Sequence, residues 1–189
     1  MLRDLVAKSR SYRRFDETVP VPMEALRNLV GLARLSPSGS NKQPLKFRLV
    51  NDVETNAKIF SCLAWAGYLS DWKGPVEGER PAAYIVILGD TELSNSFATD
   101  EGIMAQSMML GAVDKGYGGC MLGAINRTKL RELLDIPERF EVLLVLALGK
   151  PVETVVIDPV GGDGDIKYWR DAQQVHHVPK RSLDEVIVG

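Results

Sequence analysis

The segment from about residue 96 to residue 115 constrains the fold more than any other part of the sequence. It predicts a long helix that is apolar nearly all round between Ile103 and Val113. A helix without a polar face belongs in the middle of a protein or at a permanent interface. Its strongly apolar part, residues 102–113, contains a glutamine and is shorter than the roughly 20 residues needed to cross a bilayer. The segment therefore predicts a core or interface helix rather than a membrane span.

Length, charge and cysteine content fit one soluble domain. The chain has 189 residues, which suits a single domain over residues 1–189. With 23 basic and 25 acidic residues, its balance gives no reason to expect nucleic acid or an anionic membrane as a partner. The two cysteines, Cys62 and Cys120, are too few for a disulfide scaffold and lack metal-ligand spacing. The charged N-terminus has no apolar core of a secretory signal, so we expect a cytoplasmic protein.

Helical and strand patterns alternate through the first 150 residues. Besides the long helix, the periodicity and the capping residues predict helices at 22–35, at about 52–63 and at 127–134. Short apolar or alternating runs predict strands at 46–51, 82–88, 116–123 and 140–148. This pattern indicates about four strands with helices between them.

The last 40 residues differ from the rest in composition. After Gly149-Lys150-Pro151 the chain becomes polar, acidic and glycine-rich, which predicts an arm over residues 150–189 that buries little by itself. Its end carries apolar residues at Leu183, Val186, Ile187 and Val188, which need a surface to pack on. A partner subunit is one candidate for that surface.

Two segments carry groups suited to binding a polar ligand. Residues 9–15 (SRSYRRF) contain three arginines and two serines, and guanidinium groups match the oxygens of a phosphate. Residues 37–44 (PSGSNKQP) form a loop bounded by prolines and rich in amides and hydroxyls, which can direct several donors at a planar ligand. Taken alone, each also fits a plainer interpretation, namely a solvated basic face and an ordinary turn.

Two further segments, residues 116–123 and the histidine pair at 176–177, carry weaker signals. Residues 116–123 (GYGGCMLG) permit close approach of the backbone to a ligand, but a helix precedes them, so they are not a dinucleotide-binding fingerprint. Cys120 within them is expected to be a small buried residue and not a nucleophile. The adjacent His176 and His177 lack the companions of a metal site, and we expect no metal. Lys180 and Arg181, which follow the histidines, form either a second anion-binding pair or part of a solvated basic surface.

The order and spacing of these segments resemble the nitroreductase family over nearly the whole chain. Residues 10–15 are similar to the family's Arg-Ser-x-Arg-x-Phe opening, and residues 37–44 to its Pro-Ser-Gly-x-Asn-x-Gln-Pro loop. The glycine-rich run after a long helix and the closing Pro-Lys-Arg at 179–181 complete the resemblance. It implies an α+β fold with a mixed central sheet of about four or five strands flanked by helices. It also implies a homodimer that exchanges C-terminal arms and builds two FMN sites from both subunits.

The resemblance assigns one group of residues to the phosphate side of FMN. Arg10 and Ser11 would bind the phosphate or the ribityl chain, and Lys180 and Arg181 would close on the phosphate. This sequence has Ser9 where the family often has a second arginine, which weakens the expected phosphate site.

A second group is assigned to the flavin itself. Arg13 would sit against the pyrimidine edge of the ring, where a fixed positive charge stabilises the reduced flavin. Ser38 and Asn41 would also touch the cofactor, with Asn41 near the ring. Backbone amides around Gly118 and Gly119 would approach the flavin. No catalytic side chain is expected, because the cofactor carries the chemistry.

The function implied by the resemblance is an FMN-dependent oxidoreductase. It would transfer electrons from NAD(P)H to a small acceptor, such as a nitroaromatic or a quinone, by a ping-pong mechanism. Residues 64–81 would shape the substrate pocket, and the aromatic residues Trp65, Tyr68 and Trp72 in them would either stack over the ring or simply pack. Two alternatives remain open: a flavin protein of this fold with another redox chemistry, and a non-catalytic anion- or nucleotide-binding module.

Overall fold

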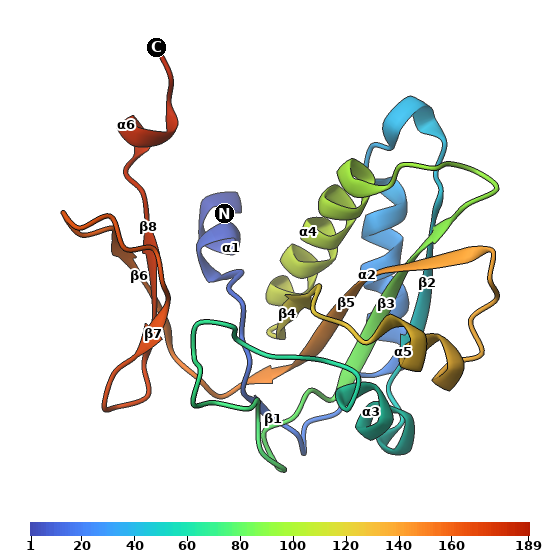
Figure 1. The fold of residues 1–189 in the computed structure, drawn as a ribbon, viewed down its shortest axis with the longest axis horizontal. Coiled ribbons are helices and arrows are strands. Elements are labelled where there is room, and N and C mark those ends of the chain that lie inside the picture. The colour runs from blue at the N-terminus through green and yellow to red at the C-terminus, as the bar shows by residue number, and fades with distance from the viewer.

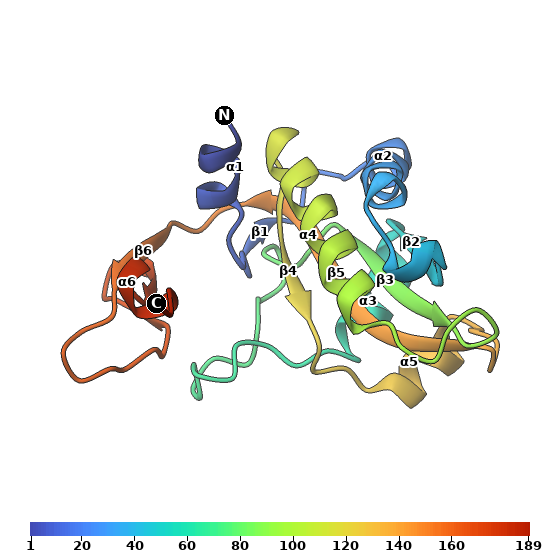
Figure 2. The same ribbon diagram turned by 90° about the horizontal axis from the view of Figure 1, so that it is seen from above.

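A computed structural model describes residues 1–189, with a central sheet between two layers of helices (Figures 1 and 2). The elements of the sheet and its helices are α1 (Leu2–Lys8), β1 (Phe15–Asp16), α2 (Met23–Leu35), the 3-10 turn η1 (Gly39–Asn41), β2 (Leu45–Val50), α3 (Val53–Phe60), β3 (Ala83–Asp90), α4 (Ala98–Asp114), β4 (Gly118–Leu122), α5 (Arg127–Leu133) and β5 (Phe140–Pro151). The predicted helices and strands of this part are all confirmed. No helix has the length and apolar character needed to cross a membrane.

The fold class is confirmed as α+β, but the central sheet is not mixed. Strand β5 lies at its centre and pairs with β3 on one side and with β4 and β1 on the other, and β2 forms the far edge. All of these pairs are antiparallel. Parallel pairing appears only in the isolated bridge between Ser11 and Gly119 and in a separate sheet of the C-terminal segment.

Strand β3 shows why the sheet is covered on both faces. All eight of its residues are buried, which a continuous apolar run without alternation predicts. Ala83, Ile85 and Ile87 pack in one cluster with α2 and α4. Tyr84, Val86 and Leu88 pack in a second cluster with α3 and α5. Figure 2 shows the same arrangement, with α2 and α4 on one side of the strands and α3 and α5 on the other.

The long helix α4 is buried on one side only. Met104, Met108 and Met109 are buried against the sheet and α2. Gly102 and Ile103 are exposed to solvent, although the sequence predicted an apolar surface on every side. Within a single chain, α4 thus keeps an uncovered apolar face. This face could form the permanent interface that the sequence allowed as an alternative to the core.

Residues 150–189 extend away from the central sheet and fold into a small sheet of their own (Figure 1). Its strands are β6 (Val155–Pro159), β7 (Trp169–Arg170) and β8 (His176–Lys180), followed by the short helix α6 (Leu183–Val186). His176 is the only buried residue of this segment, and the apolar residues at its end are exposed. The segment matches the predicted arm in burying little, and its order comes from strand pairing.

The glycines of β4 are required by packing inside the chain. A Cβ atom on Gly119 would lie 2.4 Å from the backbone oxygen of Ala147 on β5, and one on Gly118 would lie 2.6 Å from the ring of Tyr12. The sequence predicted that the backbone of these glycines approaches a ligand. In the structure it approaches β5 and the ring of Tyr12 closely.

We predict that Gly119→Ala lowers the free energy of unfolding by about 2 kcal/mol or more, because the backbone of β5 cannot move away without breaking the sheet. Gly31→Ala is the matched control: it lies inside helix α2 with nothing near its Cβ position. There, alanine should leave stability unchanged or raise it by up to about 1 kcal/mol. Urea denaturation of the two variants and the parent protein measures both effects, and equal stabilities would contradict this account.

Candidate cofactor site

A cavity of about 360 Å³ lies between the N-terminal segment, α4, β4 and the C-terminal segment. The side chains around it are mostly polar and basic. Its lining includes the following residues: Ser9, Arg10, Ser11, Arg13, Gln106, Met109, Gly119, Met121, Tyr168, His176, Val178 and Lys180. Segments from opposite ends of the chain thus meet around one space.

Five of the nine predicted cofactor residues line this cavity: Arg10, Ser11, Arg13, Gly119 and Lys180. Gly118 is next to it but faces Tyr12 and Pro151. Arg181 is exposed and pairs with Glu185 at 3.4 Å, so it does not join the cavity in this chain. The structure therefore gathers the predicted phosphate-binding groups at one place, except for Arg181.

Ser38 and Asn41 lie elsewhere, at the start of α4. The Oγ atom of Ser38 donates to a carboxylate oxygen of the buried Asp100 at 2.5 Å, and the N–H of Gly39 donates to the other oxygen at 2.8 Å. The following residues include Ser40, Asn41 and Gln43, with φ angles of 51°, 53° and 50°. Asp100 therefore fixes a loop whose backbone is in a costly conformation. Neither Ser38 nor Asn41 lines a cavity that Arg10 or Arg13 also lines.

Arg13 is buried in the wall of the cavity, with 8% of its surface exposed. Its Nη1 donates to the carbonyl oxygen of Ser11 at 3.1 Å and to Nε2 of His176 at 3.2 Å. Its guanidinium carbon lies 4.8 Å from the centre of the Tyr168 ring, in cation–π contact. Its Nε is buried without a partner, as is Nε of Arg10. Buried donors without partners are rare in native structures, so they indicate that a ligand belongs here.

A second cavity of about 230 Å³ adjoins the first, and Arg13 and Met121 line both. Its other walls are apolar and include Trp65, Cys120 and Leu122. The thiol of Cys120 is buried, and burial raises its pKa, so the prediction of a small buried residue is confirmed. A polar cavity and an apolar one thus meet at a single arginine.

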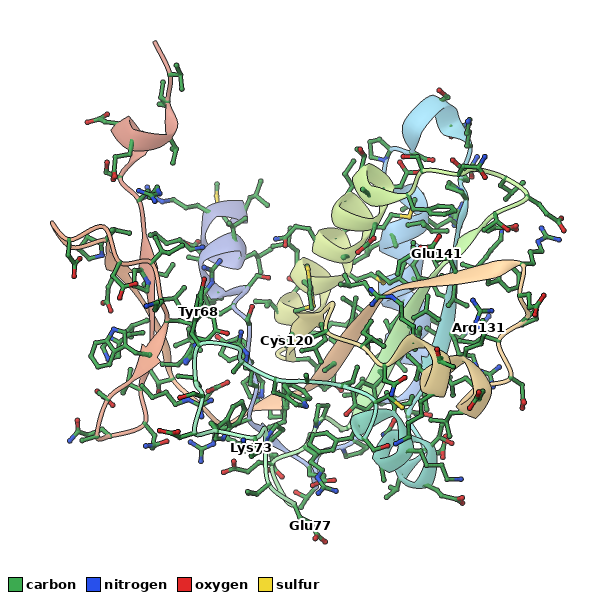
Figure 3. All side chains as sticks on the ribbon, viewed as in Figure 1. Tyr68, Lys73, Glu77, Cys120, Arg131 and Glu141 are labelled. Atoms are coloured by element: carbon green, nitrogen blue, oxygen red, sulfur yellow. The ribbon has the colours of Figure 1, made fainter.

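The aromatic residues of the 64–81 segment have different roles. Trp65 lines the second cavity, and its Nε1 has no partner. Tyr68, labelled in Figure 3, lies beside the C-terminal segment, where its ring is 4.9 Å from that of Tyr168. Trp72 supports the guanidinium of Arg170 at 4.3 Å. Only Trp65 is placed to touch a ligand, and the other two hold the C-terminal segment.

Glu153 organises the site, and the sequence analysis did not identify it. Its side chain is fully buried and accepts hydrogen bonds from the backbone N–H groups of Arg13 and Arg14. Its other oxygen accepts from Nη2 of Arg170 at 2.9 Å. A buried carboxylate is stable only when such partners surround it. No local pattern reveals this contact, because the partners are 139 and 140 residues apart in sequence.

His176 carries no metal-site companions in the sequence, and no group of side chains in the structure could hold a metal ion. It lies in the cavity wall, fully buried. Burial, together with the positive charges of Arg13 and Arg170, lowers its pKa to about 4. The ring is therefore neutral at neutral pH. Because Nε2 accepts from Arg13, the proton lies on Nδ1, which is buried and has no partner.

The two neighbouring histidines predict opposite effects of pH on stability. Below its unfolded pKa of about 6.5, His176 binds a proton in the unfolded chain but not in the folded one until about pH 4, so stability falls as pH falls through that window. The hydrogen bond to Asp158 raises the pKa of His177. The stability that protonated His177 contributes to the folded state is therefore present below pH 6.5. It is lost as pH rises through the pKa of His177 in the folded state.

Denaturation of the parent protein, His176→Gln and His177→Gln across pH 4 to 8.5 tests this prediction. Stability of the parent relative to His176→Gln should decrease toward low pH, by on the order of 2–3 kcal/mol at pH 4. Stability relative to His177→Gln should decrease toward high pH. If both differences change in the same direction, the assignment of the two rings is wrong.

Residues 6–150 match the sequence model of the nitroreductase family. The protein YodC of Bacillus subtilis (strain 168), named as an NAD(P)H nitroreductase, is 27% identical over 180 residues, covering 79% of this chain and 89% of YodC. An iodotyrosine deiodinase of Haliscomenobacter hydrossis is 25% identical, covering 78% of each chain.

A solved structure from Clostridium difficile R20291, described as an FMN-dependent nitroreductase, has the same fold. It superimposes with a TM-score of 0.66 at 24% identity and covers 79% of this chain and 87% of its own. The family match spans the N-terminal arginines, the central sheet and all the helices that cover it. The chain belongs to the nitroreductase family.

Proposed function

We propose that this chain is an FMN-dependent oxidoreductase that transfers electrons from NAD(P)H to a small acceptor, such as a nitroaromatic or a quinone, in two alternating half-reactions. Family membership supports an oxidoreductase that uses NAD(P)H. The observation that carries the proposal is the meeting of Arg10, Arg13 and Lys180 around a cavity with unpartnered buried nitrogens.

The residues present fit the parts of FMN. The polar cavity, with Arg10, Ser11 and Lys180, suits a phosphate and a hydroxylated chain. The adjoining apolar cavity suits a ring system, and the free N–H groups of Gly123 and Ala124 add donors at its edge. The unpartnered Nε atoms of Arg10 and Arg13 and Nδ1 of His176 are donors that a bound cofactor with acceptor oxygens and nitrogens would satisfy.

When bound, FMN supplies the hydride chemistry. The chain's contribution is binding, orientation and charge. Arg13 lies between the two cavities and would place a fixed positive charge against the polar edge of the ring, where negative charge develops on reduction. Its position is fixed from three sides, by the carbonyl of Ser11, by the neutral ring of His176 and by the face of Tyr168. A charge that does not need to reorganise is the most effective kind.

A second copy of the chain would supply the remaining contacts. Ser38 and Asn41 lie outside the cavity of their own chain, in a loop that Asp100 holds through Ser38 and Gly39. Helix α4 has an uncovered apolar face, and the apolar residues at the end of the arm are exposed. We infer a homodimer in which the 37–44 loop of each chain reaches the cofactor held by Arg10 and Arg13 of the other.

The first test is the visible absorption spectrum of the purified protein. We expect flavin bands at roughly 370 and 450 nm, release of about one FMN per chain on heating, and turnover of a nitroaromatic or quinone with NADH or NADPH. Arg13→Met should weaken FMN binding by about 10- to 100-fold, since a buried charged hydrogen-bonding group is lost. Arg48→Met, on the exposed edge strand β2, is the control. A colourless protein that fails to take up FMN would contradict the proposal.

Mixed dimers test whether the site is built from two chains. Arg10→Ala and Asn41→Ala should each inactivate a homodimer, because every site then lacks one contact. Refolding an equal mixture should restore about a quarter of parental activity, since half of the dimers are mixed and each has one intact site. If all contacts came from one chain, no site in the mixture would be intact. Mixing would then restore nothing.

The iodotyrosine deiodinase relative favours one alternative, in which the same cofactor reduces a halogenated aromatic compound. Assay of the reduced protein against a nitroaromatic and a halotyrosine, in parallel and without oxygen, separates the two. Faster oxidation of the flavin by the halotyrosine, with release of halide, would favour the alternative.

A further inference from the structure

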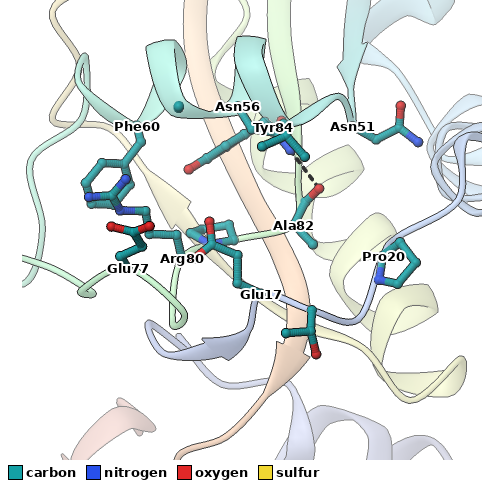
Figure 4. Close-up of a pocket in the computed structure, with 13 residues that line it drawn as sticks. Glu17, Pro20, Asn51, Asn56, Phe60, Glu77, Arg80, Ala82 and Tyr84 are labelled. Atoms are coloured by element: carbon teal, nitrogen blue, oxygen red, sulfur yellow. Dashed lines mark hydrogen bonds between the residues drawn. The ribbon is translucent and has the colours of Figure 1, made fainter.

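A cavity of about 540 Å³, larger than either cavity around Arg13, is not part of the cofactor site. It opens between α3, the start of β3 and residues 77–82, and it shares no lining residue with the two cavities around Arg13 (Figure 4). Its volume is in the range of small-molecule sites. It also contains three of the buried polar atoms that lack a partner: Oδ1 of Asn56, Nε of Arg80 and the hydroxyl of Tyr84.

Arg80 is a free cation in this cavity. It forms no hydrogen bond or ion pair within the chain, and its guanidinium carbon lies 4.6 Å from the centre of the Phe60 ring. The neighbouring Glu79 is not available to it, because Arg14 binds that carboxylate through two hydrogen bonds of 2.7 and 2.5 Å. A flat guanidinium held on an aromatic face presents its remaining N–H groups for a planar, bidentate acceptor.

Two polar side chains form the floor of the cavity. Asn56, 8% exposed, donates from its amide nitrogen to the carbonyl of Ala82 at 2.8 Å, which fixes the amide and leaves Oδ1 as a free acceptor. The hydroxyl of Tyr84 is fully buried. Burial raises its pKa, and the carboxylate of Glu17 adds to the effect, so it stays protonated and can donate. Buried groups of this kind need partners, and the chain provides none.

The charges of the cavity have both signs, so neither a plain anion nor a plain cation can pair with all of them. Glu17 and Glu77 line it beside Arg80. Oε2 of Glu17 accepts from the N–H of Gly78 at 2.6 Å, which leaves its other oxygen unengaged. A plain anion would be repelled by the two carboxylates and a plain cation by the guanidinium. Only a molecule with both charges satisfies the whole set.

We propose that this cavity binds a small aminocarboxylate, a molecule with a carboxylate and a protonated amine on an apolar body. The carboxylate pairs with Arg80, assisted by the hydroxyl of Tyr84. The amine donates to Oδ1 of Asn56 and to Glu17 or Glu77. The apolar body lies against Phe60. The site is separate from the proposed flavin site and does not depend on it.

Calorimetric titration of the protein as purified tests the site. The probes are L-leucine, isoamylamine, which lacks the carboxylate, and 4-methylpentanoate, which lacks the amine. The other standard amino acids follow. We expect at least one amino acid to bind with a Kd of about 1 mM or tighter, and its two truncated analogues to bind at least about tenfold more weakly.

Two variants and a control complete the test. Arg80→Gln should weaken binding of that amino acid at least about tenfold, whereas Arg48→Gln should not change it. Tyr84→Phe removes only the unpartnered hydroxyl, so it should fold normally and keep or raise the Tm while weakening binding. The proposal is overturned if no amino acid binds below about 10 mM, if the amine alone binds equally well, or if Arg80→Gln leaves the affinity unchanged.

Discussion

The buried carboxylate of Glu153 is the interaction on which the arrangement of the site depends. It joins the C-terminal segment, two residues beyond the end of β5, to the backbone of the N-terminal arginines and to Arg170. Without these partners a buried charge would be strongly destabilising, so the three segments are stable only together. Arg13 gains its fixed position from this arrangement, because Glu153 holds its backbone while His176 and Tyr168 hold its side chain.

The central part of the fold follows from local patterns, which is why the sequence predicted it well. The apolar run of β3 and the period of α2 each reflect contacts with the nearest layers. Asp52 begins the helix that was expected at about 52–63, and it caps α3 by accepting from the N–H of Thr55. Strand direction was less accessible, since it depends on how connections cross the sheet, and the expected mixed sheet is antiparallel.

The site was predicted from sequence motifs. A motif identifies candidate residues but does not say where the fold brings them together. Arg10, Arg13 and Lys180 meet at the cavity, but Gly118 and Gly119 are glycines because β4 packs tightly on β5 and Tyr12. No local pattern marked Glu153 or His176, because a buried hydrogen bond between distant segments is recognisable only when both partners are known. The polar composition of residues 150–189 indicated solvent exposure, whereas a few of their polar side chains are the most buried of the site.

Helix α4 explains why one chain holds only part of the predicted site. Asp100 in its first turn holds the 37–44 loop, and Gln106 and Met109 face the cavity further along. At 1.5 Å per residue, these positions are about 9 to 14 Å apart on a rigid rod. The loop cannot swing along the helix without releasing Asp100 and leaving a buried carboxylate unpaired. The uncovered face of the same helix, with Gly102 and Ile103, offers a simpler route. The second copy that we propose would pack there and bring its own loop over the cavity, while Asp100 keeps the loop of each chain fixed.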